Sequence, residues 1–176
     1  KNIPIVTVEP FVIQVEPKSG ITQVVNAQSA YEVTAKESIN TYFIVRYLKA
    51  RETVDNALAY HYEVVRLMSD PNNVFRLYTW EVNPNNPESF IARGLGGERT
   101  VKIRSIARMD NNRSCIDVVC QVQVRITIRE GGSPTLLHQI VYMDYTFTNV
   151  NLTLYERYVN PIGFRVLSYR KSNEVL

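Results

Sequence analysis

The sequence predicts an α+β fold in which N-terminal helices pack on a curved antiparallel sheet of about four strands. Between about residues 34 and 93, apolar residues recur every three or four positions, which is the spacing of one helical face. Between about residues 99 and 172 they alternate instead, which is typical of strands with one buried face. Helices followed by a strand meander favour a layered fold whose outer sheet face is free for solvent or a partner.

The composition is that of one ordinary globular domain. The chain has 176 residues, of which 45% are hydrophobic and 21% are charged. Its formal net charge of +3 is too small to indicate binding to nucleic acid or to a membrane by itself. No run of apolar residues is long enough to span a bilayer, and no signal peptide is visible. We expect residues 21–176 to form a single domain behind an N-terminal arm over residues 1–20.

The N-terminal arm is expected to be extended. Residues 3–16 carry β-branched and alternating apolar side chains, interrupted by Pro10, as in an edge strand. A turn is predicted over residues 17–20.

The first helix has a clear start signal. Thr34 and Glu37 have the spacing of a capping box, which predicts Thr34 as the N-cap. The apolar stripe that follows is long for one globular helix, and we expect a break or bend near residues 51–53. The stripe consists of Ile39, Phe43, Tyr47, Ala50, Val54, Ala57, His61, Val65 and Met68.

Two later pairs of a polar residue and a proline indicate further helix starts. Asp70-Pro71 predicts a short helix to about Trp80. Asn86-Pro87 predicts another over residues 88–93.

The sheet half begins at Arg99. Ile106 falls out of phase with Val101 and Ile103, which predicts a β-bulge. Apolar residues at alternate positions then predict one long strand with a buried face. They are Ile116, Val118, Cys120, Val122, Val124, Ile126 and Ile128.

The rest of the meander follows from turn residues and alternation. A hairpin loop is predicted over residues 130–134, and residues 149–154 are expected to form a second loop before a last strand over residues 164–169. The buried phase of the returning strand is expected to contain Val141, Met143, Tyr145 and Phe147.

The two cysteines, Cys115 and Cys120, lie five positions apart. On one strand their side chains would point to opposite faces, so we expect no local disulfide, although their redox state stays open. With only two histidines in the chain, a Cys/His zinc site is not expected either.

The sequence offers little for catalysis. His61 falls on the apolar helical stripe, where a hydrogen-bonded core role is expected. His138 and Asp144 share a strand phase but lie roughly 20 Å apart along the strand, too far for an acid–base pair. The buried phase of the long strand holds no Asp, Glu, His or Tyr, whereas cone-shaped α+β enzymes place their acid and base there. We therefore predict no enzyme, no catalytic residue, no cofactor and no metal.

Arginines are the main charge feature of the sheet half. Acidic residues are interspersed among them, which favours a solvated outer face over a nucleic-acid surface. Direct contact with DNA through this face remains a minor alternative. The basic residues are Arg93, Arg99, Lys102, Arg104, Arg108, Arg113, Arg125 and Arg129.

Residues 160–164 predict a turn. Pro161 fixes its own φ angle, and Gly163 can take a positive φ that a larger residue would resist. Aromatic and arginine side chains flank the turn, and both are favoured at protein contacts, although ordinary packing of a last strand explains them equally well. These possible contact residues are Tyr155, Arg157, Tyr158, Phe164, Arg165, Tyr169 and Arg170.

The same segment resembles a family signature. Asn160-Pro161-Ile162-Gly163-Phe164, followed by Tyr169-Arg170, is similar to the terminal Asn-Pro-any-Gly motif of the eighth VirB component of bacterial type IV secretion systems. Ile162 stands where the family often has Leu. Residues 10–20 resemble the family's transition into its periplasmic domain, and residues 37–52 resemble its first helix. The resemblance extends over nearly the whole chain.

The resemblance implies a bitopic inner-membrane protein with a periplasmic domain that folds like nuclear transport factor two. Its single membrane anchor would precede Lys1. A non-catalytic scaffold is implied, which forms a weak homodimer, contacts other channel subunits and has no small-molecule substrate. The turn residues Asn160, Pro161 and Gly163 carry over to matching positions, whereas no individual contact residue does.

A small-ligand-binding protein or enzyme on the same cone-shaped fold is the alternative. It would need an open apolar pocket with a convergent polar group. Tyr142, Tyr145 and His61 are the candidates for that group.

Overall fold

The computed structural model describes residues 11–15, 22–93, 97–111 and 114–175. Two compact units divide the chain, Lys1–Asn40 and Thr41–Leu176. In the first unit, β1 (Phe11–Val15) pairs antiparallel with β2 (Thr22–Asn26). The extended conformation predicted for the N-terminal arm is thus found at β1. The other residues of that arm, its predicted turn and the expected boundary at residue 20 lie outside the described residues.

The first helix starts earlier than predicted. Helix α1 runs over Ala27–Glu52, so Thr34 lies inside it and the predicted N-cap is wrong. Residues 27–33 contain neither glycine nor proline, so nothing stops the helix from extending towards the N-terminus. The predicted break is confirmed, because α1 ends at Glu52 and α2 begins only at Leu58 and runs to Leu67.

Short polar side chains shape the next segment. The Asp70 carboxylate accepts the backbone N–H groups of Asn72 and Asn73 at 3.1 and 2.9 Å. The helix start predicted at Asp70-Pro71 is nevertheless wrong, because α3 spans Val74–Glu81 and its N-cap is Asn73. Residues 88–93 form turns, so the helix predicted there is wrong. The Asn86 and Ser89 side chains accept local N–H groups, which satisfies the backbone without a continuing helix.

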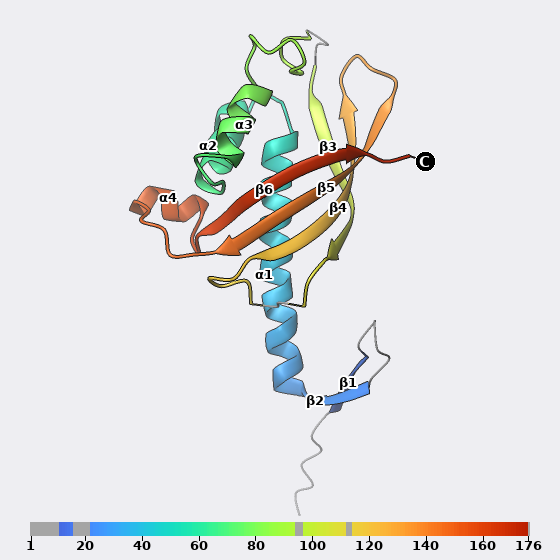
Figure 1. The fold of residues 1–176 in the computed structure, drawn as a ribbon, viewed down its shortest axis with the longest axis vertical. Helices are drawn as coiled ribbons and strands as arrows, with labels where there is room; N and C mark the ends of the chain where they lie inside the picture. Colours follow the sequence, from blue (N-terminus) through green and yellow to red (C-terminus); the bar gives the residue numbers. More distant parts are fainter. Residues whose placement is uncertain (1–10, 16–21, 94–96, 112–113, 176) are drawn as a thin grey trace, which may run out of the picture. The chain divides into compact units, whose positions relative to one another are not determined.

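The second unit contains a four-stranded antiparallel sheet in the order β3-β4-β5-β6 (Figure 1). This confirms the predicted meander. The predicted β-bulge is also confirmed, as a register shift between Ile103 and Ser105. The strands are β3 (Arg99–Arg108), β4 (Cys120–Glu130), β5 (Leu136–Phe147) and β6 (Phe164–Asn173).

The segment before β4 departs from the predicted long strand. The backbone φ angles of Cys115 and Asp117 are +52° and +51°, which a β-strand cannot contain. Strand β4 therefore begins at Cys120, and Ile116 and Val118 are exposed instead of buried. The left-handed residues fold the chain back, so that Cys115 and Cys120 form a disulfide with their Cα atoms 5.6 Å apart. The prediction of no local disulfide is wrong.

An additional helix, α4 (Leu154–Val159), follows the predicted loop. Its N-cap is Thr153, whose hydroxyl accepts the Glu156 N–H at 3.3 Å, while the Glu156 carboxylate accepts the Thr153 N–H at 2.9 Å. This capping box is visible in the sequence as Thr-x-x-Glu.

The core of the second unit lies between one face of the sheet and three helices, namely the part of α1 after Asn40, α2 and α3 (Figure 1). The predicted buried phase of β5 is confirmed, because all four of its residues are buried. Phe43 of α1 stacks on Phe164 of β6 with ring centroids 5.6 Å apart. Across the described residues, no helix combines the length and apolar character that a bilayer crossing requires.

Candidate functional site

Asn160 joins two distant elements through its side-chain amide. It is fully buried, and its Nδ2 donates to the carbonyl oxygens of Leu67 at 2.9 Å and Phe164 at 3.0 Å. Its Oδ1 accepts the Phe164 N–H at 2.8 Å. The end of α2 and the start of β6 therefore share one side chain that both donates and accepts, which an amide can do and a carboxylate cannot.

Gly163 is required for two reasons. Its φ angle is +67°, in the left-handed region that residues with a side chain rarely adopt. A Cβ atom at this position would also lie 1.9 Å from the carbonyl oxygen of Thr148. The Gly163 carbonyl in turn accepts the Thr148 N–H at 3.0 Å, so the turn is closely packed against the segment after β5.

The turn directs β6 onto the end of α2. The Val166 N–H donates to the Met68 carbonyl, and the Asp70 N–H donates to the Val166 carbonyl, both at 2.8 Å. These bonds form a parallel bridge between Ser69 and Val166. The Asn-Pro-Ile-Gly segment thus sets the path of the backbone into β6. It offers no exposed reactive group.

The predicted contact residues separate into two groups. Tyr155 and Tyr158 on α4 are 67% and 77% exposed. Arg157 and Arg170 are also exposed, and Arg165 is half-buried. Phe164 is fully buried, so it is not available as a surface contact. Its ring packs against those of Tyr145 and Phe147.

Tyr169 belongs to a buried charged cluster that the sequence did not indicate. Its hydroxyl donates to Glu52 of α1 at 2.6 Å. Glu52 also accepts hydrogen bonds from Arg99 of β3 at 2.8 Å and Lys171 of β6 at 3.0 Å. Burial alone would raise the pKa of Glu52, but Lys171, Arg99 and Arg51 together hold it at about 2.

Arg51 extends this cluster towards α3. Its Nη2 donates to both carboxylate oxygens of Glu81 at 2.9 Å, and its guanidinium lies 4.0 Å from the centre of the Tyr169 ring. The same guanidinium lies 5.2 Å from the centre of the Tyr78 ring. Burial raises the pKa of Tyr78 to about 12. The charges compensate one another, which indicates a structural role for the cluster.

The residues considered for ligand binding do not converge. Tyr145 lies in the core, whereas Tyr142 is exposed and lies in the opposite phase of β5. His61 is hydrogen-bonded to Asp55, with His61 Nε2 3.1 Å from Asp55 Oδ1. In the part of the chain that the structure describes, no group of three or more His, Cys, Asp or Glu side chains is arranged to hold a metal ion.

Comparison with known proteins identifies the family of the chain. The model of the VirB8 protein family matches residues 2–174. The chain belongs to the VirB8 family. It is therefore a component of the type IV secretion machinery.

Individual type IV secretion system proteins agree with this assignment. The VirB8 protein of Bartonella quintana is 32% identical over 98% of this chain and 72% of its own length. The secretion protein PtlE of Bordetella pertussis is 28% identical over 98% of this chain and 72% of its own length.

Solved structures of the VirB8 type confirm the fold expected from the resemblance, that of nuclear transport factor two. The soluble domain of TrwG from Bartonella grahamii matches with a TM-score of 0.66 and 25% identity, over 79% of this chain and 96% of that one. VirB8 of Agrobacterium tumefaciens matches with a TM-score of 0.61 and 24% identity, over 81% of this chain and 95% of that one.

Proposed function

We propose that this chain is a non-catalytic assembly domain on the periplasmic face of the bacterial inner membrane. In this proposal it self-associates and contacts other secretion-channel subunits through the α4 surface, which we define as Leu154, Tyr155, Arg157, Tyr158 and Ile162. The exposure of the aromatic side chains on this surface is the observation that carries the proposal.

The α4 surface has the composition of a contact site. Leu154 is 73% exposed and Ile162 is 44% exposed, and they accompany the two exposed tyrosines and Arg157. Tyrosine and arginine are enriched where proteins bind one another, and exposed apolar groups gain most from burial in a complex.

The α4 surface is also fixed before any partner binds. Val159 and Asn160 anchor the end of the helix in the core. Arg66 of α2 forms an ion pair with Glu156 of α4 at 3.0 Å. A rigid surface loses less conformational entropy on binding, which favours a role in assembly.

The location is supported by the disulfide. Disulfides form and persist in oxidising compartments such as the bacterial periplasm, and they are rare in the cytosol. The Cys115–Cys120 bond therefore favours the periplasmic side of the membrane for this domain.

The absence of catalysis is supported by the inner face of the sheet. Val122, Val124, Ile126 and Ile128 of β4 are all buried and carry no ionisable group. Rings of Phe43, Tyr145 and Phe164 pack together over this region. An enzyme on this fold would need an acid and a base on this face.

Sedimentation velocity tests the contact proposal. Replacing Tyr155 and Tyr158 together by serine should raise the dissociation constant of self-association roughly tenfold or more. Tyr60→Ser is the matched control, because Tyr60 is 53% exposed on α2, and it should leave association unchanged. Equal association of all three proteins would overturn the assignment of the α4 surface.

A further inference from the structure

The disulfide closes a small ring whose backbone is held in an unfavourable conformation. Cys115 and Cys120 are separated by 5 positions, and two of the residues from Cys115 to Cys120 have positive φ angles. Residues other than glycine adopt that conformation when surrounding bonds enforce it. We call residues 115–120 the disulfide loop.

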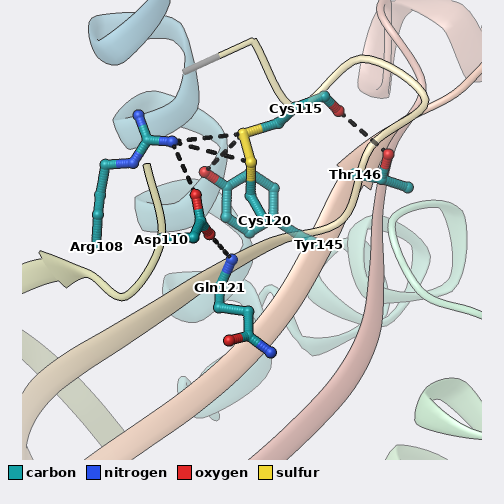
Figure 2. The surroundings of a disulfide bond; sticks show 7 residues. All are labelled: Arg108, Asp110, Cys115, Cys120, Gln121, Tyr145 and Thr146. Atoms are coloured by element: carbon teal, nitrogen blue, oxygen red, sulfur yellow. Dashed lines mark hydrogen bonds and ion pairs between the residues drawn. A yellow bond between two sulfur atoms is a disulfide. The ribbon is translucent and has the colours of Figure 1, made fainter. Parts of the chain in front are cut away.

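Besides the disulfide, bonds to β5 hold the disulfide loop, including the pairing of Cys120 with Tyr145 and a bridge between Ile116 and Phe147. The Cys115 carbonyl accepts the Phe147 N–H at 2.7 Å and the Thr146 hydroxyl at 3.1 Å, and the Asp117 N–H donates to the Phe147 carbonyl at 2.9 Å. All of these bonds go to the end of β5, and Figure 2 shows the one between Thr146 and the Cys115 carbonyl. The apolar side chains of the loop add little, because Ile116 is 60% exposed, Val118 45% and Val119 48%.

The environment of the sulfur atoms favours thiol–disulfide exchange once the loop opens locally. Both cysteines are fully buried, so a reductant reaches the sulfur atoms only through such an opening. The Arg108 Nη2 lies 3.9 Å from each sulfur atom, and a nearby guanidinium stabilises a thiolate, the reactive form in disulfide exchange. The Tyr145 hydroxyl lies 3.5 Å from the Cys115 sulfur (Figure 2).

The rest of the second unit has hydrogen bonds that do not involve the two cysteines. Strand β4 pairs with β3 from Val122 onwards and with β5 from Cys120 to Arg129. The motif turn is fixed by its own bonds to Leu67 and Thr148. Loss of the disulfide should therefore release the loop without unfolding the sheet.

We propose that the Cys115–Cys120 disulfide is a redox-sensitive switch that fixes the disulfide loop, and its exposed apolar side chains, to the end of β5. Oxidation requires another disulfide, that of a protein or of oxidised glutathione, as the electron acceptor. One cysteine thiolate attacks that disulfide and forms a mixed disulfide, and the second cysteine then displaces the acceptor in its thiol form. Two electrons and two protons pass to the acceptor.

Amide hydrogen exchange of the whole chain, with and without a thiol reductant, tests the proposal. After reduction, the Asp117 and Phe147 amides should exchange faster by a factor on the order of tens. This factor corresponds to the loop-closure entropy that so short a ring removes from the open state. The Val166 amide, bonded to Met68, is the internal control and should not change. Alkylation and mass measurement on the oxidised protein should find no free thiol.

A variant with both cysteines replaced by serine separates the bond from the reductant. It should match the reduced wild-type chain and be insensitive to the reductant. Unchanged exchange at Asp117 and Phe147 after reduction would overturn the proposal. So would loss of protection throughout the sheet, which would make the disulfide a support of the whole fold, or free thiols after treatment with oxidised glutathione. Should the serine variant not fold, the reduced wild-type chain still gives the answer.

Discussion

The Cα of Gly163 faces the carbonyl oxygen of Thr148 so closely that a methyl group on it would lie 1.9 Å from that oxygen. No side-chain rearrangement can relieve this contact, because both partners are backbone. The segment after β5 and the turn before β6 are therefore in contact at a position that only glycine fits.

Gly163→Ala should lower the free energy of unfolding by about 2–4 kcal/mol, since the backbone must move and the φ angle is unfavourable. Urea denaturation followed by circular dichroism measures this. Gly97→Ala is the matched control, because Gly97 also has a positive φ of +84° but its nearest neighbour would lie 3.5 Å away. The control should lose only about 1 kcal/mol. Equal losses would contradict a steric role of Thr148.

Asn160→Asp should destabilise the domain by about 3 kcal/mol at neutral pH. The carboxylate would face the Leu67 and Phe164 carbonyl oxygens without a proton to donate, in a fully buried position. Part of the loss should be recovered at acidic pH, where the carboxyl group is protonated and donates again. Asn151→Asp, at an exposed position, should change thermal stability little at either pH. A destabilisation of Asn160→Asp that does not depend on pH would argue against this explanation.

Acid should weaken the fold through Glu52. Its pKa falls from an ordinary 4.5 to about 2 in the folded chain, so its stabilising contribution is complete above pH 5 and is lost as the pH falls towards 2. The loss should approach about 3 kcal/mol. Urea midpoints between pH 6 and pH 2 measure it. The urea midpoint of Glu52→Gln should be lower than that of the wild type and should change less with pH. Glu88→Gln, at an exposed position, should have the wild-type midpoints at every pH. An unchanged slope for Glu52→Gln would contradict this assignment.

The features that the sequence predicted are those specified by neighbouring residues. Alternation from Val122 to Ile128 defines the inner face of β4, and the phase break at Ile106 marks the bulge. The break after Glu52 was also predictable, because the apolar stripe is longer than one globular helix. In each case the signal lies within a single segment of the sequence.

The features that were missed depend on residues that the local pattern does not connect. Alternation predicted one strand from Ile116 to Ile128, but the positive φ angle at Asp117 interrupts it. Strand β4 therefore begins only at Cys120, and Ile116 forms an isolated parallel bridge with Phe147. The start of α1 was misplaced because Thr34 and Glu37 have cap spacing inside a helix that nothing upstream interrupts. Helix α4 was missed although its capping box is present in the sequence.

The candidate site was only partly predictable. The motif predicted the positive φ angle of Gly163. The close approach of the Thr148 carbonyl is a tertiary contact that the motif does not indicate. The partners of Glu52 come from β3 and β6 as well as α1, and no periodicity links Arg99 to Lys171. Such a cluster is visible only when the folded chain brings the three elements together.

The hydrogen bond from Asn160 to Leu67 spans 93 residues, and it has a consequence for folding kinetics. Contacts between distant parts of a chain form late, because a long loop must close before they are gained. During synthesis, α2 must therefore wait for the C-terminal segment to leave the ribosome before its last carbonyl finds a partner. A chain that stops before Asn160 would lack Phe164 and Val166 and could not close its core, so incomplete products should be recognised and degraded.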